Sequence, residues 1–146
     1  LGKSDSSFEN YFTDLARRYV GKLVTVIAFN PDLSRKIYSG ADLFLMPSKS
    51  EPCGLSQMIA SRYGAVPIVR ETGGLYDSIK PVGNGGNGFT FANYNAYDML
   101  YVIREAINCY YNKEFWPQLV KRVMSVDFSW QRSAKEYEKM YGEMLK

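Results

Sequence analysis

The chain has 146 residues, of which 46% are hydrophobic and 15% aromatic, so it can bury one core and we predict a single globular unit over residues 1–146. Its 18 Lys and Arg residues exceed its 15 Asp and Glu residues by only +3 in net charge and are scattered along the chain, which argues against nucleic acid as a partner. No apolar run is long enough to span a bilayer and the N-terminus lacks the zones of a signal peptide, so we expect no membrane partner.

The sequence contains no histidine. This absence excludes Ser-His-Asp and Cys-His nucleophilic sites, HExxH zinc sites and zinc fingers from the chain. Chemistry here would use carboxylates, amides or hydroxyls, or groups supplied from outside the chain, and we expect neither a metal nor a cofactor. The two cysteines, Cys53 and Cys109, lie far apart in unlike contexts, which favours free thiols over a disulfide.

In chain order, residues 7–20 come first: apolar side chains at helical spacing predict an amphipathic helix there, namely Phe8, Phe12, Leu15, Ala16 and Tyr19. Residues 22–29, KLVTVIAF, are rich in β-branched residues and predict a strand. The next predicted helix has Asn30 as its cap, Pro31 at its first position and Gly40 at its end.

Residues 41–47, ADLFLMP, are a continuous apolar run that is typical of a strand buried on both faces. Apolar residues then recur at helical spacing as far as Gly64, namely Leu55, Met58, Ile59 and Tyr63. AVPIVR, residues 65–70, predicts a second strand. A strand, a helix and a strand in this order predict a parallel βαβ unit and an α/β fold.

Residues 80–88, KPVGNGGNG, predict a loop, and GFTF after it predicts another strand. The remainder predicts three helices, over residues 97–111, 114–126 and 130–145. We expect their in-phase apolar residues and their many aromatic residues to be core: Leu100, Ile103, Ile107, Phe115, Leu119, Val123, Trp130, Ala134, Tyr137, Tyr141 and Met144.

Residues 48–56 follow the carboxyl end of a predicted strand, which is where open α/β sheets bind ligands. Gly54 lets the backbone approach a ligand closely, and the N–H groups of Gly54, Leu55 and Ser56 at the helix start favour an anion. Glu51 would not welcome a phosphate, but it suits a hydroxyl donor such as a sugar. The loop therefore suggests a sugar phosphate or a nucleotide sugar.

A second loop, Thr72, Gly73 and Gly74, follows the next strand and supplies further flexible amides. Each loop alone also fits an ordinary turn with a solvated acid, and it is the adjacent pair that favours a phosphate-binding site. Cys53 is interpreted as a small buried side chain and not as a catalytic group, because the chain has no histidine to activate it.

Residues 41–79, ADLFLMPSKSEPCGLSQMIASRYGAVPIVRETGGLYDSI, closely resemble the hallmark segment of bacterial glycogen synthases and plant starch synthases. The resemblance continues through GFTF to residues 127–141, DFSWQRSAKEYEKMY, and covers nearly the whole chain. It implies the C-terminal domain of a two-Rossmann, or GT-B, glycosyltransferase. The fold expected is a partial Rossmann-like parallel sheet with flanking helices and without the domain's first strands.

Such enzymes transfer glucose from ADP-glucose, or from UDP-glucose in some members, to the non-reducing end of an α-1,4-glucan with retention and without a required metal. The resemblance implies two partners, a nucleotide-sugar donor and an α-1,4-glucan acceptor. It also implies a bacterial cytoplasm or a plastid stroma as the location. The alternative is a non-catalytic remnant that binds a nucleotide sugar or a glucan and acts through interaction.

The family's functional residues can be assigned to the matching positions of this sequence. The resemblance implies that Glu51 binds donor-sugar hydroxyls near the reacting carbon and is the catalytic residue. Cys53 and Gly54 would give main-chain contacts to the glucose. Leu55 and Ser56 would hold the diphosphate at the helix start.

The resemblance also assigns the second loop to the donor site, where Thr72, Gly73 and Gly74 would border the same pocket. Phe29 falls where the family usually has a tyrosine that stacks on the adenine, and a phenyl ring retains the stacking. The helix from Trp130 would pack towards the other domain.

The sequence departs in one place from related transferases and in another from the glycogen and starch synthase family itself. Ile59 stands eight residues after Glu51, where other nucleotide-sugar transferases carry a second glutamate, which favours the glycogen and starch synthase branch. Lys49 and Ser50 replace the usual Arg-Phe, so an aromatic side chain beside the acid is absent.

The resemblance implies an N-terminal domain, with a lysine-glycine-glycine loop and a pocket histidine, and an Arg and Lys pair that neutralises the departing diphosphate, and these 146 residues include neither. Leaving-group stabilisation is much of glycosyl transfer, so we predict negligible turnover by the chain alone. In the family's strand order of 3-2-1-4-5-6, residues 22–29 would also lack their neighbours. Either the remaining strands re-pair, or residues 42–47 present an unpaired apolar edge.

Overall fold

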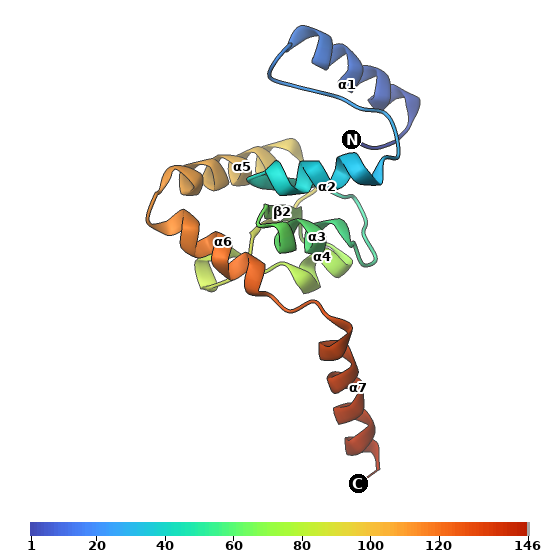
Figure 1. Ribbon diagram of the computed structural model, residues 1–146, viewed down its shortest axis with the longest axis vertical. Coiled ribbons are helices and arrows are strands. Elements are labelled where there is room, and N and C mark those ends of the chain that lie inside the picture. Colours follow the sequence, from blue (N-terminus) through green and yellow to red (C-terminus); the bar gives the residue numbers. More distant parts are fainter. Residues whose placement is uncertain (146) are drawn as a thin grey trace. The chain divides into compact units, whose positions relative to one another are not determined.

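The computed structural model describes residues 1–145, apart from the side chain of Asn84. By their contacts the residues group into two units, residues 1–37 and the chain from residue 38 onward. Figure 1 follows the elements of both units along the chain. Among residues 1–145, no helix combines the length and the apolar character needed to cross a membrane.

The first unit is a helix followed by an extended segment. Helix α1, Ser6–Arg18, confirms the predicted helix. The strand predicted over residues 22–29 is wrong, because the segment forms only an isolated parallel bridge between Ile27 and Gly2. A β-branched run becomes a strand only when a neighbour pairs with it, and the described residues provide no such ladder.

Helix α2, Pro31–Gly40, begins in the first unit and confirms the predicted start signals. The Leu33 N–H donates to Asn30 Oδ1 at 2.9 Å, and the Ser34 N–H donates to the Asn30 carbonyl at 3.0 Å. Asn30 therefore caps the helix, and Pro31 occupies a position where no N–H is needed.

The second unit contains a parallel sheet of strand order β1-β2-β3. Strand β1 is Leu43–Met46, β2 is Val66–Arg70 and β3 is Phe89–Phe91. Leu43 pairs with Val66, and Ile68 pairs with Phe89. Helix α3, Ser56–Tyr63, connects β1 to β2, so the predicted βαβ unit and the α/β fold class are confirmed.

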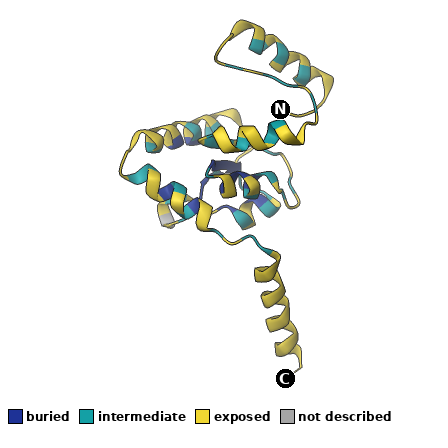
Figure 2. Ribbon diagram, viewed as in Figure 1, coloured by how far each residue is buried: buried dark blue, intermediate teal, exposed yellow. Residues whose placement is uncertain are grey.

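Strand β2 is dark blue in Figure 2, and four of its five residues are buried. Strand β1 is only partly buried. Leu45 is 43% exposed, so the prediction that residues 41–47 are buried on both faces is wrong. Within the described residues β1 pairs with β2 alone, which makes β1 an edge strand. Of the two arrangements expected, the unpaired apolar edge is the one observed.

The remaining elements are helices, and three of them match the prediction. Helix α5 is Ala96–Tyr111, α6 is Phe115–Ser125 and α7 is Trp130–Met144. The short helix α4, Gly73–Ser78, was not predicted, because two glycines begin it and six residues give no periodicity. A 3-10 turn, Val82–Asn84, lies in the predicted glycine-rich loop.

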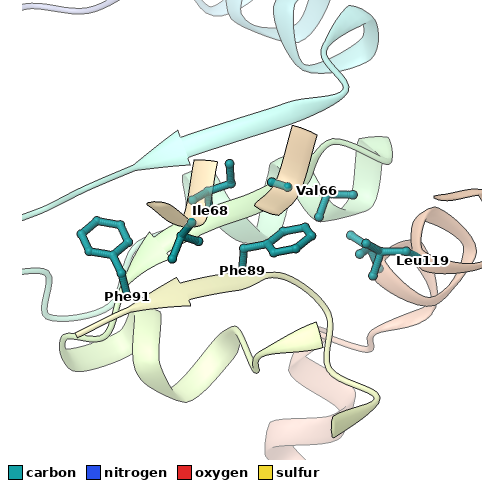
Figure 3. Packing of buried hydrophobic residues seen from close by; sticks show 8 residues of the cluster. Val66, Ile68, Phe89, Phe91 and Leu119 are labelled. Carbon is teal, nitrogen blue, oxygen red and sulfur yellow. The ribbon is translucent and has the colours of Figure 1, made fainter. Parts of the chain in front are cut away.

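The main core lies between the sheet and helices α5 and α6 (Figure 3). Eight buried residues form it: Val66, Ile68, Phe89, Phe91, Val102, Ala106, Leu119 and Val123. Phe115 and Trp116 pack against this cluster. The predicted core residues of α6 are therefore in place.

The predicted cores of α5 and α7 are corrected by the structure. Helix α5 buries Val102 and Ala106, whereas Leu100 and Ile107 are more than 40% exposed. Helix α7 has no buried residue, and Trp130 is 86% exposed. An amphipathic pattern identifies an apolar face, but burial needs a neighbour, and no described element covers the face of α7.

Candidate functional site

Two loops meet at the carboxyl ends of β1 and β2. The Gly74 N–H, at the start of α4, donates to the Glu51 carbonyl at 3.1 Å. A Cβ atom on Gly73 would lie 2.2 Å from that same carbonyl oxygen, and one on Gly74 would lie 2.1 Å from the Cys53 carbonyl oxygen. Only glycine allows this approach, so residues 73 and 74 hold the two predicted loops against each other.

The start of α3 presents main-chain donors beside this contact. Gly54 has a φ of +72°, Leu55 is the N-cap residue and Ser56 begins the helix. Within the described residues no acceptor is recorded for the N–H groups of Gly54, Leu55 or Ser56. Unpaired amides together with the positive end of the helix dipole can bind an anion.

Glu51 is half-buried in the loop between β1 and α3. Its carboxylate makes no hydrogen bond or ion pair with the described residues, while its main chain is held by Gly74. A fixed backbone with a free carboxylate can accept hydrogen bonds from the hydroxyls of a ligand.

The other predicted site residues differ in how far they are exposed. Thr72 is half-buried at the N-cap of α4. Leu55 is 66% exposed beside the amides of the α3 start. Phe29 is 88% exposed and belongs to the first unit, whereas both loops belong to the second.

The interpretation of Cys53 as a buried side chain is wrong. Cys53 is exposed in the loop before α3, and its Sγ donates to the Gly54 carbonyl at 3.7 Å. Cys53 and Cys109 are both free thiols, as predicted. Burial, reinforced by the charge of Glu105, raises the pKa of the Cys109 thiol on α5.

The buried face of α3 is not the apolar face that the sequence indicated. The buried residues are Gln57, Ala60 and Ser61. The predicted apolar face is turned away, with Ile59 41% and Tyr63 43% exposed. A polar residue within a buried helix face signals a hydrogen-bonding role, and Gln57 has one.

The Gln57 amide is fully buried beneath the loop. Its Nε2 donates to the Gly54 carbonyl at 2.7 Å, to the Cys53 carbonyl at 3.2 Å and to Ser78 Oγ at 3.1 Å. Ser78 Oγ in turn donates to the Gly74 carbonyl at 2.6 Å. Gln57 thus joins the loop after β1 to helix α4.

Arg70, the last residue of β2, was likewise not predicted as part of the site. Its Nε donates to the Ser48 carbonyl at 2.9 Å and its Nη2 to the Lys49 carbonyl at 2.5 Å. Its Nη1 donates to the Ala92 carbonyl at 3.3 Å, and the guanidinium lies 5.6 Å from the centre of the Tyr94 ring. Arg70 therefore links the segments that follow β1 and β3.

A cavity of about 590 Å³ adjoins Pro52, Cys53 and Gly74. Three basic residues and one acid contribute to its lining, namely Lys80, Arg122, Arg132 and Asp77. The Nε of Arg122 is buried and has no partner within the described residues. Those residues contain no group of three or more Cys, Asp or Glu side chains that could hold a metal ion.

The family model for "Glycosyl transferases group 1" matches residues 5–117, a range that includes all three strands and both loops. The chain belongs to the glycosyl transferases group 1 family. Membership in this family agrees with the parallel α/β fold and with the resemblance found in the sequence.

The chain is also similar to individual glycogen synthases. The chain is 52% identical to a glycogen synthase of Geobacillus thermodenitrificans (strain NG80-2), over 100% of this chain and 31% of that protein. It is 49% identical to a glycogen synthase of Bacillus cereus (strain Q1), over 99% of this chain and 31% of that protein. The chain thus spans about a third of the length of these curated relatives.

Two solved structures extend the similarity to the fold. The catalytic domain of starch synthase IV from Arabidopsis thaliana, bound to ADP and acarbose, superposes with a TM-score of 0.85 at 38% identity, over 97% of this chain and 31% of that one. Sucrose-phosphate synthase from Thermosynechococcus elongatus superposes with a TM-score of 0.65 at 23% identity, over 98% of this chain and 36% of that one, and shows the fold alone.

Proposed function

We propose that residues 1–146 are the donor-binding part of the C-terminal domain of a glycogen or starch synthase. The whole enzyme would transfer glucose from ADP-glucose or UDP-glucose to the non-reducing end of an α-1,4-glucan, with retention. The observation that supports the proposal is the contact between the two loops, the first of which has a free carboxylate at Glu51 and unpaired amides at the start of α3. The identity with glycogen synthases supports it.

The amides would hold the diphosphate of the donor. Leu55 and Ser56 lie at the positive end of α3, where a phosphate is favoured by both the N–H groups and the helix dipole. Gly54 and Cys53 would offer main-chain contacts to the sugar. Thr72, Gly73 and Gly74 would form the opposite border of the pocket, and Phe29 would stack on the base.

Glu51 would bind the hydroxyls of the donor glucose. As the bond to the diphosphate breaks, positive charge develops on the sugar, and a nearby carboxylate stabilises that charge. The negative charge of the departing diphosphate needs cations, which we expect from an Arg and Lys pair in a part of the whole protein outside these residues. The chain alone would therefore bind a donor without transferring its glucose. The expected location of the whole protein is a bacterial cytoplasm or a plastid stroma.

The test is a transfer assay on the full-length protein with ADP-glucose or UDP-glucose and a glucan primer, alongside calorimetric titration of each donor. Glu51→Ala is expected to lower kcat by about 10²–10³-fold, because it removes a group that acts on the developing charge. The Glu51 side chain makes no hydrogen bond or ion pair with the described residues, so the melting temperature should change little.

Glu114→Ala is a matched control, because Glu114 is an exposed acid outside the site and the same charge is removed. Near-normal transfer by Glu51→Ala with a native melting profile would remove the role of Glu51. Donor binding by a full-length protein that transfers no glucose would favour the non-catalytic alternative.

A further inference from the structure

The loop that carries Glu51 has no helix or strand of its own between β1 and α3, yet its main chain is held from outside at five carbonyl oxygens. Arg70 binds those of Ser48 and Lys49, the Gly74 N–H binds that of Glu51, and Gln57 binds those of Cys53 and Gly54. The attachments therefore lie before, at and after Glu51.

The Arg70 guanidinium is well suited to the first attachment. It is planar with five N–H donors in fixed directions, and three of its nitrogens reach three different carbonyl oxygens. No carboxylate contacts it within the described residues. Its charge is thus directed entirely at main-chain acceptors and at the Tyr94 ring. A lysine has the charge but lacks this geometry.

The Gln57 amide forms the second attachment and carries an unpaired atom. Its Nε2 has three acceptors, but its Oε1 is buried without a hydrogen-bond partner. The reverse orientation of the amide would direct Oε1 at two carbonyl oxygens, so the orientation observed is the favourable one. An unpaired buried oxygen is destabilising, and an apolar residue of this size would avoid that cost but would also release Cys53 and Gly54.

We propose that Arg70 and Gln57 are positioning residues, which fix the loop so that the Glu51 carboxylate meets the donor sugar correctly. This inference rests on the proposed function of Glu51. The diphosphate contacts of Leu55 and Ser56 depend mainly on α3, because the Ile59 N–H donates to the Leu55 carbonyl at 2.9 Å and the helix packs on the sheet and on α6. Loss of either attachment should therefore affect transfer more than donor binding, because small misplacements of a catalytic group are costly.

The experiment uses the full-length protein with its nucleotide-sugar donor and a glucan primer. Gln57→Met keeps the volume and removes the N–H donors, and Arg70→Lys keeps the charge and removes the fork. We expect each to lower kcat by about tenfold or more, with KM for the donor changed by less than about threefold. Gln118→Met and Arg104→Lys make the same exchanges at exposed positions and should match the unmodified protein.

Gln57→Glu adds a readout that loss of packing would not give. The introduced carboxyl group can donate one hydrogen bond to the Gly54 carbonyl when protonated, and it repels both carbonyl oxygens when ionised. Burial raises the pKa of such a group. Transfer by Gln57→Glu, divided by that of the unmodified protein, should therefore rise as the pH falls, whereas the ratio for Gln57→Met should stay constant.

Unchanged kcat in Gln57→Met and Arg70→Lys would overturn the inference. A rise in KM for the donor as large, in fold-change, as the loss of kcat would overturn it as well. If Gln57→Met does not fold, Arg70→Lys decides by the same criteria. Glu51→Ala is measured in parallel: if it retains transfer, the proposed function fails and the inference falls with it. If Glu51→Ala is inactive while the Arg70 and Gln57 variants are normal, only this inference fails.

Discussion

The loops at the carboxyl ends of β1 and β2 and the helix α7 are both rich in residues that sequence patterns single out, but they differ in how they are held. The loops are fixed by hydrogen bonds from Arg70, Gln57 and Gly74, above a buried core. Helix α7 has the more regular apolar pattern and no buried residue. The difference shows that periodicity identifies a face, whereas order at a site depends on what the backbone contacts.

The largest expected effect contrasts two glycines. In Gly74→Ala the new methyl group would lie 2.1 Å from the Cys53 carbonyl oxygen, so the two loops must separate. We expect a loss of transfer of about 100-fold in the full-length protein, because a displacement of about 1 Å at the chemistry has that cost. The measurement is kcat with a glucan primer.

Gly142→Ala is the matched control, because a Cβ atom there meets nothing within 4 Å. It should leave transfer unchanged and stabilise α7 by about 0.5–1 kcal/mol, since alanine is the better helix former. Equal effects of the two substitutions would contradict the contrast between the loops and α7.

The next effect compares a core residue with an exposed one by urea unfolding of the chain. Leu119 is 0% exposed in the main core, so Leu119→Ala should lower the free energy of unfolding by about 2–5 kcal/mol. Trp130 is 86% exposed, so Trp130→Ala should change it by less than about 0.5 kcal/mol.

Repeating both in the full-length protein sharpens the comparison. If another part of that protein covers α7, as the resemblance implies, Trp130→Ala becomes costly there. A large cost of Trp130→Ala in the isolated chain would instead mean that the face of α7 is already packed.

The smallest effect concerns protonation at the start of α5. Hydrogen bonds from the Asn93 side chain and then from Asn95 lower the pKa of Asp98. A lowered folded-state pKa favours the folded protein above the ordinary pKa of the carboxyl, and this contribution is lost as the pH falls through the lowered value. Asn93→Ala should move the pKa of Asp98 back towards its ordinary value in a carboxyl NMR titration.

Asp127, before α7, serves as the internal control for that titration. Its pKa is lowered by hydrogen bonds from Ser129, which do not involve Asn93, so its titration should not change. A shift of both carboxyls would indicate a general effect of the substitution and not the loss of one hydrogen bond.

Much of the fold and of the site could be predicted from local signals. Asn30, Pro31 and Gly64 mark helix ends because capping is a local interaction. The adjacency of the two loops followed from parallel strands, whose carboxyl ends lie at one edge. Residues 22–29 could not be predicted correctly, because whether they form a strand depends on a partner and not on their own propensity.

The site residues that the sequence did not reveal act through the main chain. Gln57 and Arg70 bind carbonyl oxygens, and every residue has a carbonyl, so no motif identifies the partner. The buried face of α3 was missed for a related reason, since Gln57 and Ser61 are polar residues buried by hydrogen bonding. The exposed position of Cys53 depends on a loop conformation that no periodicity describes.

The central claim is that the two loops together bind the donor. Hydrogen–deuterium exchange of the full-length protein, followed by mass spectrometry with and without ADP-glucose or UDP-glucose, tests it directly. The account predicts that the donor protects the amides of residues 53–56 and 72–74, because they bind the diphosphate and border the sugar. Measurable binding of a donor without protection of either loop would contradict it.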